Sequence, residues 1–261
     1  MPATAPGPGY RERNSTADRT LDILAMFDQS SPTVSIAQVV AALGVSRSTA
    51  YRYMQSLVQA RFLEESGAGE FRLGSRVLEL AYIARRGLDL SELARPVMHQ
   101  LAAETGETVL LNRWAGTSVI CLEREDVTGR TIRISYERGQ VFPGHAGAAA
   151  YVLLGGRSPE QLDELLARLD LRSFTPETVT SADALRTRVA EAERLGYAVS
   201  RGELDRDVLG IAAPVRSDGE VVASLGIAAI SSQVPDQRAR ELCAAVVSAA
   251  GRLSASLALL R

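Results

Sequence analysis

The first 75 residues have hydrophobic positions that recur with helical spacing and then change to the spacing of strands. Apolar residues predict a helix over residues 16–27, a second over 36–43 and a third that begins at Arg47. The runs 62–63 and 71–73 flank a segment with two glycines and predict a β-hairpin. This order of elements is typical of a winged helix-turn-helix, in which the hairpin forms the wing.

The second and third predicted helices are bounded by residues that satisfy free backbone groups. Ser35 and Gln38 have the spacing of a capping box at the start of the second helix. Gly44 ends that helix, and Ser46 is predicted to cap the third. Two helices that meet at a glycine also occur in proteins that never touch nucleic acid. The residues on the polar side of the third helix therefore have to distinguish a helix pair that only packs from one that binds DNA.

That polar side carries hydrogen-bonding residues and no acid, as a helix that reads the major groove requires. No Asp or Glu occurs between Gln29 and Leu63, which favours contact with phosphates. A solvated surface arginine remains the simpler interpretation of Arg47 or Arg52 taken alone. Arg19 and Arg72 suit phosphates better than bases. We predict that DNA is bound by Arg19, Ser46, Arg47, Ser48, Thr49, Tyr51, Arg52, Gln55 and Arg72.

From residue 75 onward the pattern alternates between helices and β-branched runs, which predicts an α+β fold with a mixed sheet of largely antiparallel strands flanked by helices. A helix with a break near Gly87 is expected to connect the two halves. The predicted strands are 108–114, 118–123, 131–136, 197–200, 208–215 and 221–230, and the predicted helices are 75–105, 146–154, 161–169, 182–195 and 238–260.

Composition narrows the class of protein. Hydrophobic residues make up 46% and charged residues 23% of the 261 residues, values typical of globular proteins. Residues 1–87 hold 10 Arg against 8 acidic residues, although the whole chain has a net charge of −2 and contains no Lys. Cys121 and Cys243 are isolated, so neither a disulfide framework nor a zinc site is expected. No secretory signal or membrane span is expected either, and we predict a cytoplasmic protein.

Several motifs resemble those of the IclR family of transcriptional regulators in order and spacing. The resemblance covers about residues 16–260 and implies a GAF-like effector domain after the winged helix-turn-helix. The expected organisation is a disordered tail at 1–15, a DNA-binding domain at 16–74, a linker helix at 75–90 and an effector-binding domain at 91–261. The motifs are Arg19–Leu24, Ser35–Ala37, Leu43–Val45, Ser48–Arg52, Phe71–Gly74, Gly196–Ala198, Glu203 and Ile211–Val215.

The resemblance places an effector pocket beside the small-residue segment 143–150 and the late strands. His145 stands there at a helix start, where free N–H groups could hold an anion. The alternative is a histidine that ties the loop to its own backbone, whereas His99 is expected to be structural. The residues implied in effector binding are Gly144, His145, Ala146, Gly147, Ala148, Tyr151, Ser200, Gly210, Gly226 and Ala228.

Departures from the family pattern bear on the ligand. Many members have Gly-Lys where this chain has Ala150-Tyr151, Cys where it has Gly210, and Ser near Gly226 and Ala228. Burying a small carboxylate without those polar groups would cost several kcal/mol. The smaller side chains are also expected to enlarge the cavity. We therefore expect a larger, less polar ligand, such as an aromatic or branched metabolite with one acidic end. The alternative is a pocket filled by Tyr151 or Trp114.

The leading hypothesis is a ligand-responsive regulator that binds a pseudo-palindromic promoter site as a homodimer or a dimer of dimers, because one helix reads too few base pairs. A small-molecule-processing enzyme with an accessory DNA-binding domain is the alternative, and a GAF-like module whose helices only pack is a third. No nucleophile elbow, phosphate loop, dinucleotide motif or metal-ligand spacing is found, so no cofactor, metal or catalytic residue is predicted.

Overall fold

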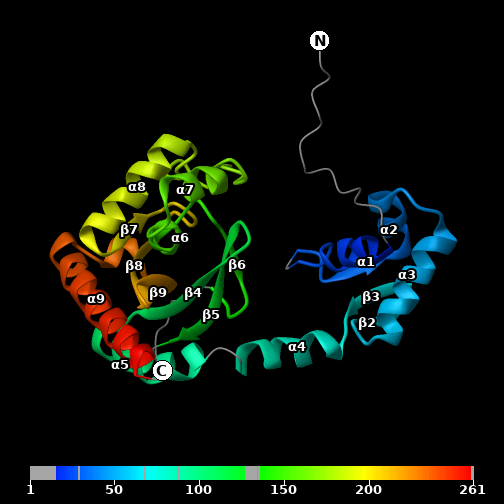
Figure 1. Ribbon diagram of the computed structural model, residues 1–261, viewed down its shortest axis with the longest axis horizontal. Coiled ribbons are helices and arrows are strands. Elements are labelled where there is room, and N and C mark those ends of the chain that lie inside the picture. The colour runs from blue at the N-terminus through cyan, green and yellow to red at the C-terminus, as the bar shows by residue number, and fades with distance from the viewer. Residues whose placement is uncertain are drawn as a thin grey trace, which may run out of the picture. The chain divides into compact units, whose positions relative to one another are not determined.

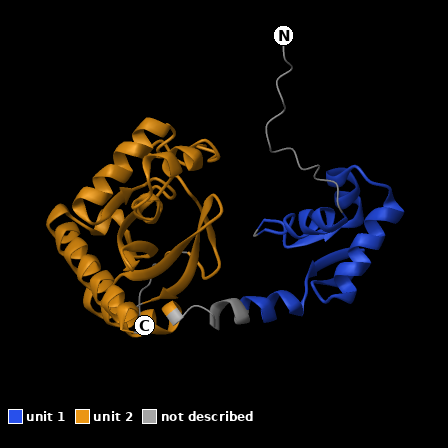
Figure 2. Ribbon diagram, in the orientation of Figure 1, with its two compact units in different colours: residues 1–87 blue, residues 88–261 orange. Residues whose placement is uncertain are grey.

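The chain forms two compact units, residues 1–87 and 88–261 (Figure 2). Each unit has its own hydrophobic core. The computed structural model describes residues 16–28, 30–67, 69–86, 89–126, 134 and 136–259. The predicted tail at 1–15 lies outside the described residues, as does most of the predicted strand at 131–136.

Unit 1 is a helix-turn-helix followed by a hairpin, as the sequence pattern predicts. Its three strands form an antiparallel sheet in the order β1-β3-β2. The short first strand was not predicted, and the first helix ends at Leu24 rather than at Phe27. The elements are α1 (Thr16–Leu24), β1 (Thr33–Ser35), α2 (Ile36–Leu43), α3 (Arg47–Gln59), β2 (Leu63–Gly67), β3 (Glu70–Leu73) and α4 (Ser75–Arg86).

Local capping fixes the angle between α2 and α3. The Ser35 hydroxyl accepts a hydrogen bond from the backbone N–H of Gln38, and the Gln38 side-chain oxygen accepts one from the backbone N–H of Ser35. These two bonds confirm the predicted capping box. Gly44 ends α2 with a φ of 64°, and Ser46 caps α3 by accepting from the Thr49 backbone. The apolar side of α3 then packs into the core of unit 1.

Unit 2 contains a six-stranded antiparallel sheet in the order β6-β5-β4-β9-β8-β7 (Figure 1). The helices and strands predicted within the described residues of unit 2 are present, and the edge strand β6 was not predicted. The elements are α5 (Asp89–Thr105), β4 (Thr108–Ala115), β5 (Ser118–Glu125), β6 (Val141–Pro143), α6 (Ala148–Leu154), α7 (Pro159–Leu166), α8 (Ala182–Leu195), β7 (Ala198–Arg201), β8 (Val208–Ser217), β9 (Glu220–Ile230), a 3-10 turn (Ser231–Gln233) and α9 (Asp236–Ala258).

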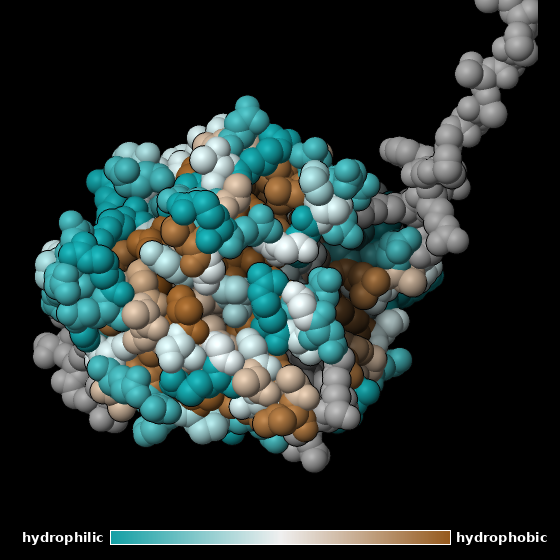
Figure 3. Space-filling view, turned by 60° about the vertical axis from the view of Figure 1, so that its left-hand side comes forward, coloured by the Kyte–Doolittle hydropathy of each residue, from teal (hydrophilic) through white to brown (hydrophobic). Residues whose placement is uncertain are grey.

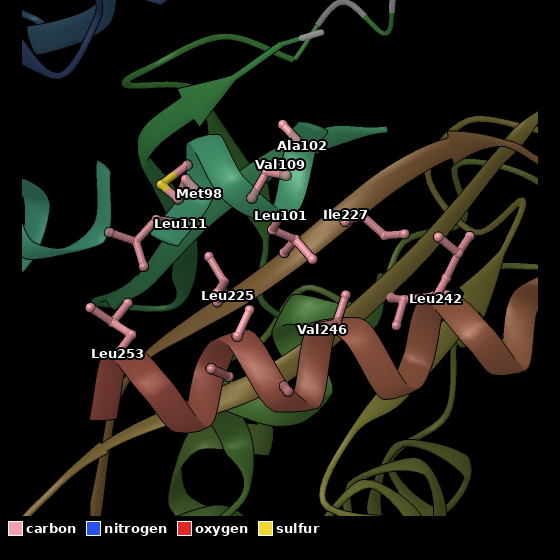
Figure 4. Close-up of a cluster of buried hydrophobic side chains, with 14 of the residues drawn as sticks. Met98, Leu101, Ala102, Val109, Leu111, Leu225, Ile227, Leu242, Val246 and Leu253 are labelled. Carbon is pink, nitrogen blue, oxygen red and sulfur yellow. The ribbon is translucent and has the colours of Figure 1, made fainter. Parts of the chain in front are cut away.

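Helices cover both faces of this sheet. On one face, α5 and α9 pack against large apolar residues of β4, β8 and β9, and Figure 4 shows Leu101, Leu225 and Val246 in this layer. On the other face, α6 and α8 form a second core with smaller residues of the sheet. Side chains alternate between the two faces along a strand, so the residues that pack under α5 and α9 are different from those that face α6 and α8.

Helix α9 is the one helix among the described residues that is long and apolar enough to cross a membrane. Its apolar side, which includes Leu242, Val246 and Leu253, is fully buried against the sheet. Hydrophobic residues on the face shown in Figure 3 are interspersed with hydrophilic ones, without a continuous apolar belt. Its packing therefore makes α9 a core helix of unit 2.

On the face of the sheet that is covered by α6 and α8, small residues lie next to one another on neighbouring strands. Ser200, Gly210 and Ala228 form one row over β7, β8 and β9. Ala212 and Gly226 are paired in the next row. Small side chains leave open space between this part of the sheet and the start of α6. The row at Gly226 is nevertheless tight, because a Cβ there would lie 2.4 Å from the carbonyl oxygen of Ile211.

Replacing Gly226 by alanine is expected to destabilise unit 2, because the new methyl group would clash with backbone of β8. Overpacking of this kind costs about 1–3 kcal/mol, measurable by urea unfolding followed by circular dichroism. Gly251→Ala is the matched control, since a Cβ there meets nothing within 4 Å. Removing that helical glycine should raise the free energy of unfolding by about 0.5–1 kcal/mol. Two variants of equal stability would contradict the close approach at Gly226.

Candidate DNA interface and cavity

The outer side of α3 carries two arginines that are free to bind another molecule. Arg47 and Arg52 are exposed, and neither guanidinium group forms an ion pair or hydrogen bond with any part of the chain that the structure describes. Tyr51, between them, is 50% exposed. A helix with exposed guanidinium and phenol groups and no acid can enter a DNA groove without repelling the phosphates.

The other predicted residues of α3 already have partners within unit 1. The Ser46 hydroxyl lies 3.0 Å from that of Ser48 and 2.9 Å from that of Thr49, so these three form a cluster at the start of α3. Gln55 lies farther along and donates to Glu65 of the hairpin at 3.3 Å. The hydroxyl cluster is exposed, and each hydroxyl can still exchange a partner for a phosphate or base edge.

Arg19 and Arg72 are less available than the sequence suggests. Arg19 donates to the backbone carbonyl of Leu43 at 2.8 Å and so ties α1 to the end of α2. Arg72 pairs with Glu64 across the hairpin at 3.2 Å. Both arginines therefore have a structural role in unit 1. The sequence predicted contacts with phosphates and did not predict these contacts within the fold.

The hairpin is acidic, which limits what a wing could do. Glu64, Glu65 and Glu70 lie on β2 and β3, directly after the acid-free run. Arg61, the remaining arginine of that run, pairs with Glu79 of α4 at 2.8 Å. Three carboxylates beside one paired arginine disfavour close approach to DNA phosphates. Among the described residues of unit 1, α3 therefore carries the exposed arginines that have no acidic partner.

Unit 2 contains a cavity of about 590 Å³, part of it open to solvent, between the start of α6 and the second face of the sheet. Seven of the residues implied by the resemblance line the cavity, and three do not: Gly144, His145 and Tyr151. The seven are Ala146, Gly147, Ala148, Ser200, Gly210, Gly226 and Ala228.

His145 is turned away from the cavity and ties two loops together. Its Nε2 lies 2.9 Å from the carbonyl oxygen of Arg172, so Nε2 carries a hydrogen and donates. The imidazole is 1% exposed and stacks on Phe174. Gly144 is required by packing, because a Cβ there would lie 2.4 Å from the carbonyl oxygen of Thr117. Both residues position the start of α6, and the histidine bonds the backbone of a second loop rather than that of its own loop.

Tyr151 lies behind the cavity wall and holds a buried carboxylate. Its hydroxyl donates to Glu203, which also accepts from the Gly147 backbone at 2.8 Å. Arg188 lies 3.4 Å from Glu203, with its guanidinium 5.0 Å from the centre of the Tyr151 ring. Burial, assisted by the nearby Glu203 charge, raises the pKa of the Tyr151 phenol well above its usual value. The phenol is therefore neutral and remains a donor.

Glu203 is the residue of the site that sequence reasoning missed. It was noted only as part of the resemblance, yet it lines the cavity and is 6% exposed. Its partner Gly147 lies 56 residues earlier in the chain, too far for any local pattern to connect them. A signal was available, because a buried carboxylate needs several donors and the start of a helix supplies them.

The expected enlargement of the cavity is wrong at two positions. The space that a Cβ at Gly210 would take is held by the Ser200 hydroxyl, 2.7 Å away. That hydroxyl accepts from the Ala148 backbone at 3.0 Å. At Gly226 the space is held by backbone of β8. Glycine at these sites therefore permits close packing and adds little volume.

Other polar groups of the cavity are few. Asn112 lines its floor and is 3% exposed, and its buried Oδ1 has no hydrogen-bond partner among the described residues. Asp205 lies at the edge, where it accepts a hydrogen bond from Tyr136. No group of three or more His, Cys, Asp or Glu side chains that could hold a metal ion is found in the described ranges.

Comparisons with known proteins give consistent results for both units. The model of the IclR helix-turn-helix domain matches residues 16–67, and that of the bacterial transcriptional regulator IclR C-terminal domain matches residues 82–255. The HTH-type transcriptional regulator BhcR of Paracoccus denitrificans is 31% identical over 251 residues, which cover 92% of this chain and 86% of that protein.

Solved structures agree over nearly the whole chain. A protein from Silicibacter sp. described as an IclR transcriptional regulator is 28% identical, with a TM-score of 0.83 over 94% of this chain and 96% of that one. An IclR homologue from Microbacterium hydrocarbonoxydans, crystallised with 4-hydroxybenzoate, is 27% identical, with a TM-score of 0.78 over 93% of this chain and 99% of that one.

Replacing both Arg47 and Arg52 by alanine is expected to remove most of the affinity for DNA, because these arginines have no other partner in the described part of unit 1. A base contact is worth about 1–3 kcal/mol, and each lost phosphate contact flattens the dependence of log affinity on log salt by about one. Binding is measured on DNA that the parent chain selects from a random pool.

Arg76→Ala is the matched control, since Arg76 pairs with Glu79 and lies on α4. It should leave both affinity and salt dependence close to those of the parent. Unchanged binding by the double variant would show that another surface contacts the DNA.

Proposed function

Because the chain belongs to the IclR family of bacterial transcriptional regulators, we propose that it is a ligand-responsive regulator that binds a pseudo-palindromic promoter site through α3. The acid-free face of α3 with its two unpaired arginines is the observation that carries this proposal. Family membership makes the chain a transcriptional regulator with a helix-turn-helix DNA-binding domain and a C-terminal effector domain, not an enzyme. A DNA-binding regulator works in the cytoplasm, which is where we place it.

We propose that consecutive segments of the chain have different functions. Residues 16–74 bind DNA, residues 75–90 transmit the signal, and residues 91–261 bind the effector. This proposal is supported by the compact units 1–87 and 88–261 and by the two family models. A role of the helix-turn-helix in packing alone would not account for unpaired arginines on α3, and both family models describe regulators rather than enzymes.

In the DNA complex that we propose, α3 lies in the major groove, with Arg47, Tyr51 and Arg52 toward base edges. Ser46, Ser48 and Thr49 lie at the start of α3, where hydroxyl groups suit the phosphate backbone. Arg19 and Arg72 make at most secondary phosphate contacts, because each first has to loosen a contact within unit 1.

Apolar residues left exposed on unit 1 support a homodimer. Leu78 of α4 is 74% exposed, Leu80 of α4 is 38% exposed and Leu21 of α1 is 63% exposed. Leucines at this exposure have no packing role in a single copy, whereas a second copy would bury them. Two copies also double the number of base pairs read, which a single recognition helix needs for specificity. A dimer of dimers would extend the same argument to two sites.

We propose that the effector binds in the cavity of unit 2. Its lining of apolar and small side chains suits a single aromatic ring or a branched aliphatic body, and the relative crystallised with 4-hydroxybenzoate supports a compact ligand of this kind. A ligand changes DNA affinity only if it binds one arrangement of the protein more tightly than another. A difference of about 1–3 kcal/mol would change promoter binding about 5–150-fold.

Replacing Leu78 by glutamate is expected to shift the protein from dimer to monomer, because a charge cannot be buried between two copies without a partner. Sedimentation velocity at micromolar concentration measures the change, and affinity for the selected DNA should fall in parallel. Val141→Glu is the control, since Val141 is 61% exposed on β6 of unit 2. A parent chain that sediments only as a monomer, with and without DNA, would refute the dimer.

Replacing Ala228 by leucine is expected to abolish the response to effector while leaving ligand-free DNA binding nearly intact, because the larger side chain fills the cavity from its floor. Ala255→Leu on the exposed side of α9 is the control. Thermal shift with a set of aromatic and branched metabolites measures binding to each variant. Equal binding to the parent and to the Ala228 variant would place the effector elsewhere.

A further inference from the structure

One polar side chain on the floor of the cavity has no partner within the described fold. Asn112 of β4 is 3% exposed and lines the cavity. Its Oδ1 is enclosed without a hydrogen-bond partner, and none of the described residues forms a hydrogen bond with its Nδ2. Since Oδ1 is enclosed, Nδ2 is the polar atom that this side chain presents to the cavity. Buried amides are nearly always hydrogen-bonded, so the unpaired donor points to an acceptor that a ligand supplies.

The other polar side chains of the lining are already engaged within unit 2. The Ser200 hydroxyl and the Glu203 carboxylate each accept a hydrogen bond from a backbone N–H at the start of α6. At the edge of the cavity, Asp205 accepts a hydrogen bond from Tyr136. A ligand that bonds to Asn112 breaks none of these contacts, and its acceptor satisfies a donor that is otherwise unpaired.

Strand register places Asn112 away from the polar residues beneath α6. Its partner on β9 lies four residues from Ala228, which belongs to the row of Ser200. At about 3.3 Å per residue, the two rows are about 13 Å apart along the strands. Leu110 and Gly226 are paired in the row between them and also line the cavity. The floor therefore has an apolar middle, with the Asn112 amide on the β4 side of it.

The surroundings of Asn112 make its amide selective. Towards β5 and β6 the lining is apolar, because Val119 and Phe142 are paired there and face the cavity. A hydrogen bond in such surroundings is stronger than one in water. A ligand with a methyl group at this place would leave the amide unpaired and without water. The amide therefore distinguishes a ligand that has an acceptor from an apolar ligand of the same shape.

We infer that Asn112 determines the specificity of the effector site: the effector has an apolar body that ends in an acceptor oxygen over β4, and the Asn112 Nδ2–H donates to that oxygen. This inference rests on the proposed function, because it takes the cavity to be the effector site. The other end of the effector is left open, an acidic group included.

The experiment compares pairs of probes that differ only in an acceptor, by ligand-observed NMR titration of the full chain. One pair is phenol and toluene, and the other is acetophenone and isopropylbenzene. Acetophenone accepts hydrogen bonds and donates none, so its binding reports on a donor in the protein. The oxygen-containing member of each pair should bind about two- to tenfold more tightly, the equivalent of one net hydrogen bond.

Two variants of Asn112 remove the donor in different ways. Asn112→Leu keeps the branched shape with methyl groups in place of Oδ1 and Nδ2, and Asn112→Ala adds no bulk. Both should lose the preference for phenol and acetophenone, while toluene and isopropylbenzene bind at least as tightly as they bind to the parent. Because the measured quantity is a ratio within each pair, a general loss of stability does not imitate this result.

Ser224→Ala is the matched control. Ser224 is paired with Asn112 across β9 and β4, is fully buried and also has an unpartnered side-chain oxygen, but it does not line the cavity. This variant should keep the preference of the parent. Ala228→Leu should remove the binding of all four probes and so localise them to the cavity.

The outcomes separate the inference from the proposed function. Equal affinities within the pairs, a preference that survives in Asn112→Leu, or no binding by any probe would overturn the inference. Probes that bind Ala228→Leu as they bind the parent would also overturn it, because they would lie outside the cavity. The proposed function is tested separately by whether the parent chain selects a specific DNA sequence, a result that depends on none of the probes.

Discussion

The buried carboxylate of Glu203 is the constraint on which the cavity and its surroundings depend. A charged group that is 6% exposed has to be met by donors, and here they come from three distant parts of the chain: the Gly147 backbone, the Tyr151 hydroxyl and the Arg188 guanidinium. These contacts hold the start of α6 and the side of α8 against the turn after β7. Removing one partner would leave the others unpaired in a buried site, so they act together and fix where the cavity wall stands.

The same arrangement explains why the floor of the cavity consists of small residues. With α6 held at its start by Glu203, and with Ala148 bonded to Ser200, the helix lies close above β7 and β8. Larger side chains at Gly210 would collide with the Ser200 hydroxyl. The opposite face of the same strands carries large apolar residues under α5 and α9, and this layer supplies most of the buried surface. One face of the sheet therefore stabilises the unit, while the other leaves space for a ligand.

The parts of the structure that sequence predicts well are those set by neighbouring residues. The capping box at Ser35, the glycine end of α2 and the cap at Ser46 depend on groups within four residues of one another. Contacts between distant residues escape such patterns. Arg19 meets a carbonyl 24 residues away, Glu203 meets an amide 56 residues away, and the approach of β8 to Gly226 depends on strand register. Each of these changed the interpretation of a site residue, because a side chain with a partner inside the fold is less available to DNA or ligand.

This difference in availability shapes DNA recognition. In the described part of unit 1, Arg47 and Arg52 are unpaired, whereas Arg61, Arg72 and Arg76 pair with glutamates. Two free cations per copy release few counterions on binding, so non-specific affinity from these residues is modest and falls gently with salt. In the proposed homodimer, selectivity then comes from base contacts that symmetry repeats. If the proposed homodimer has so few contacts with DNA, a small shift in the placement of its two recognition helices is enough to lose the site, and the binding energy of one effector molecule can supply such a shift.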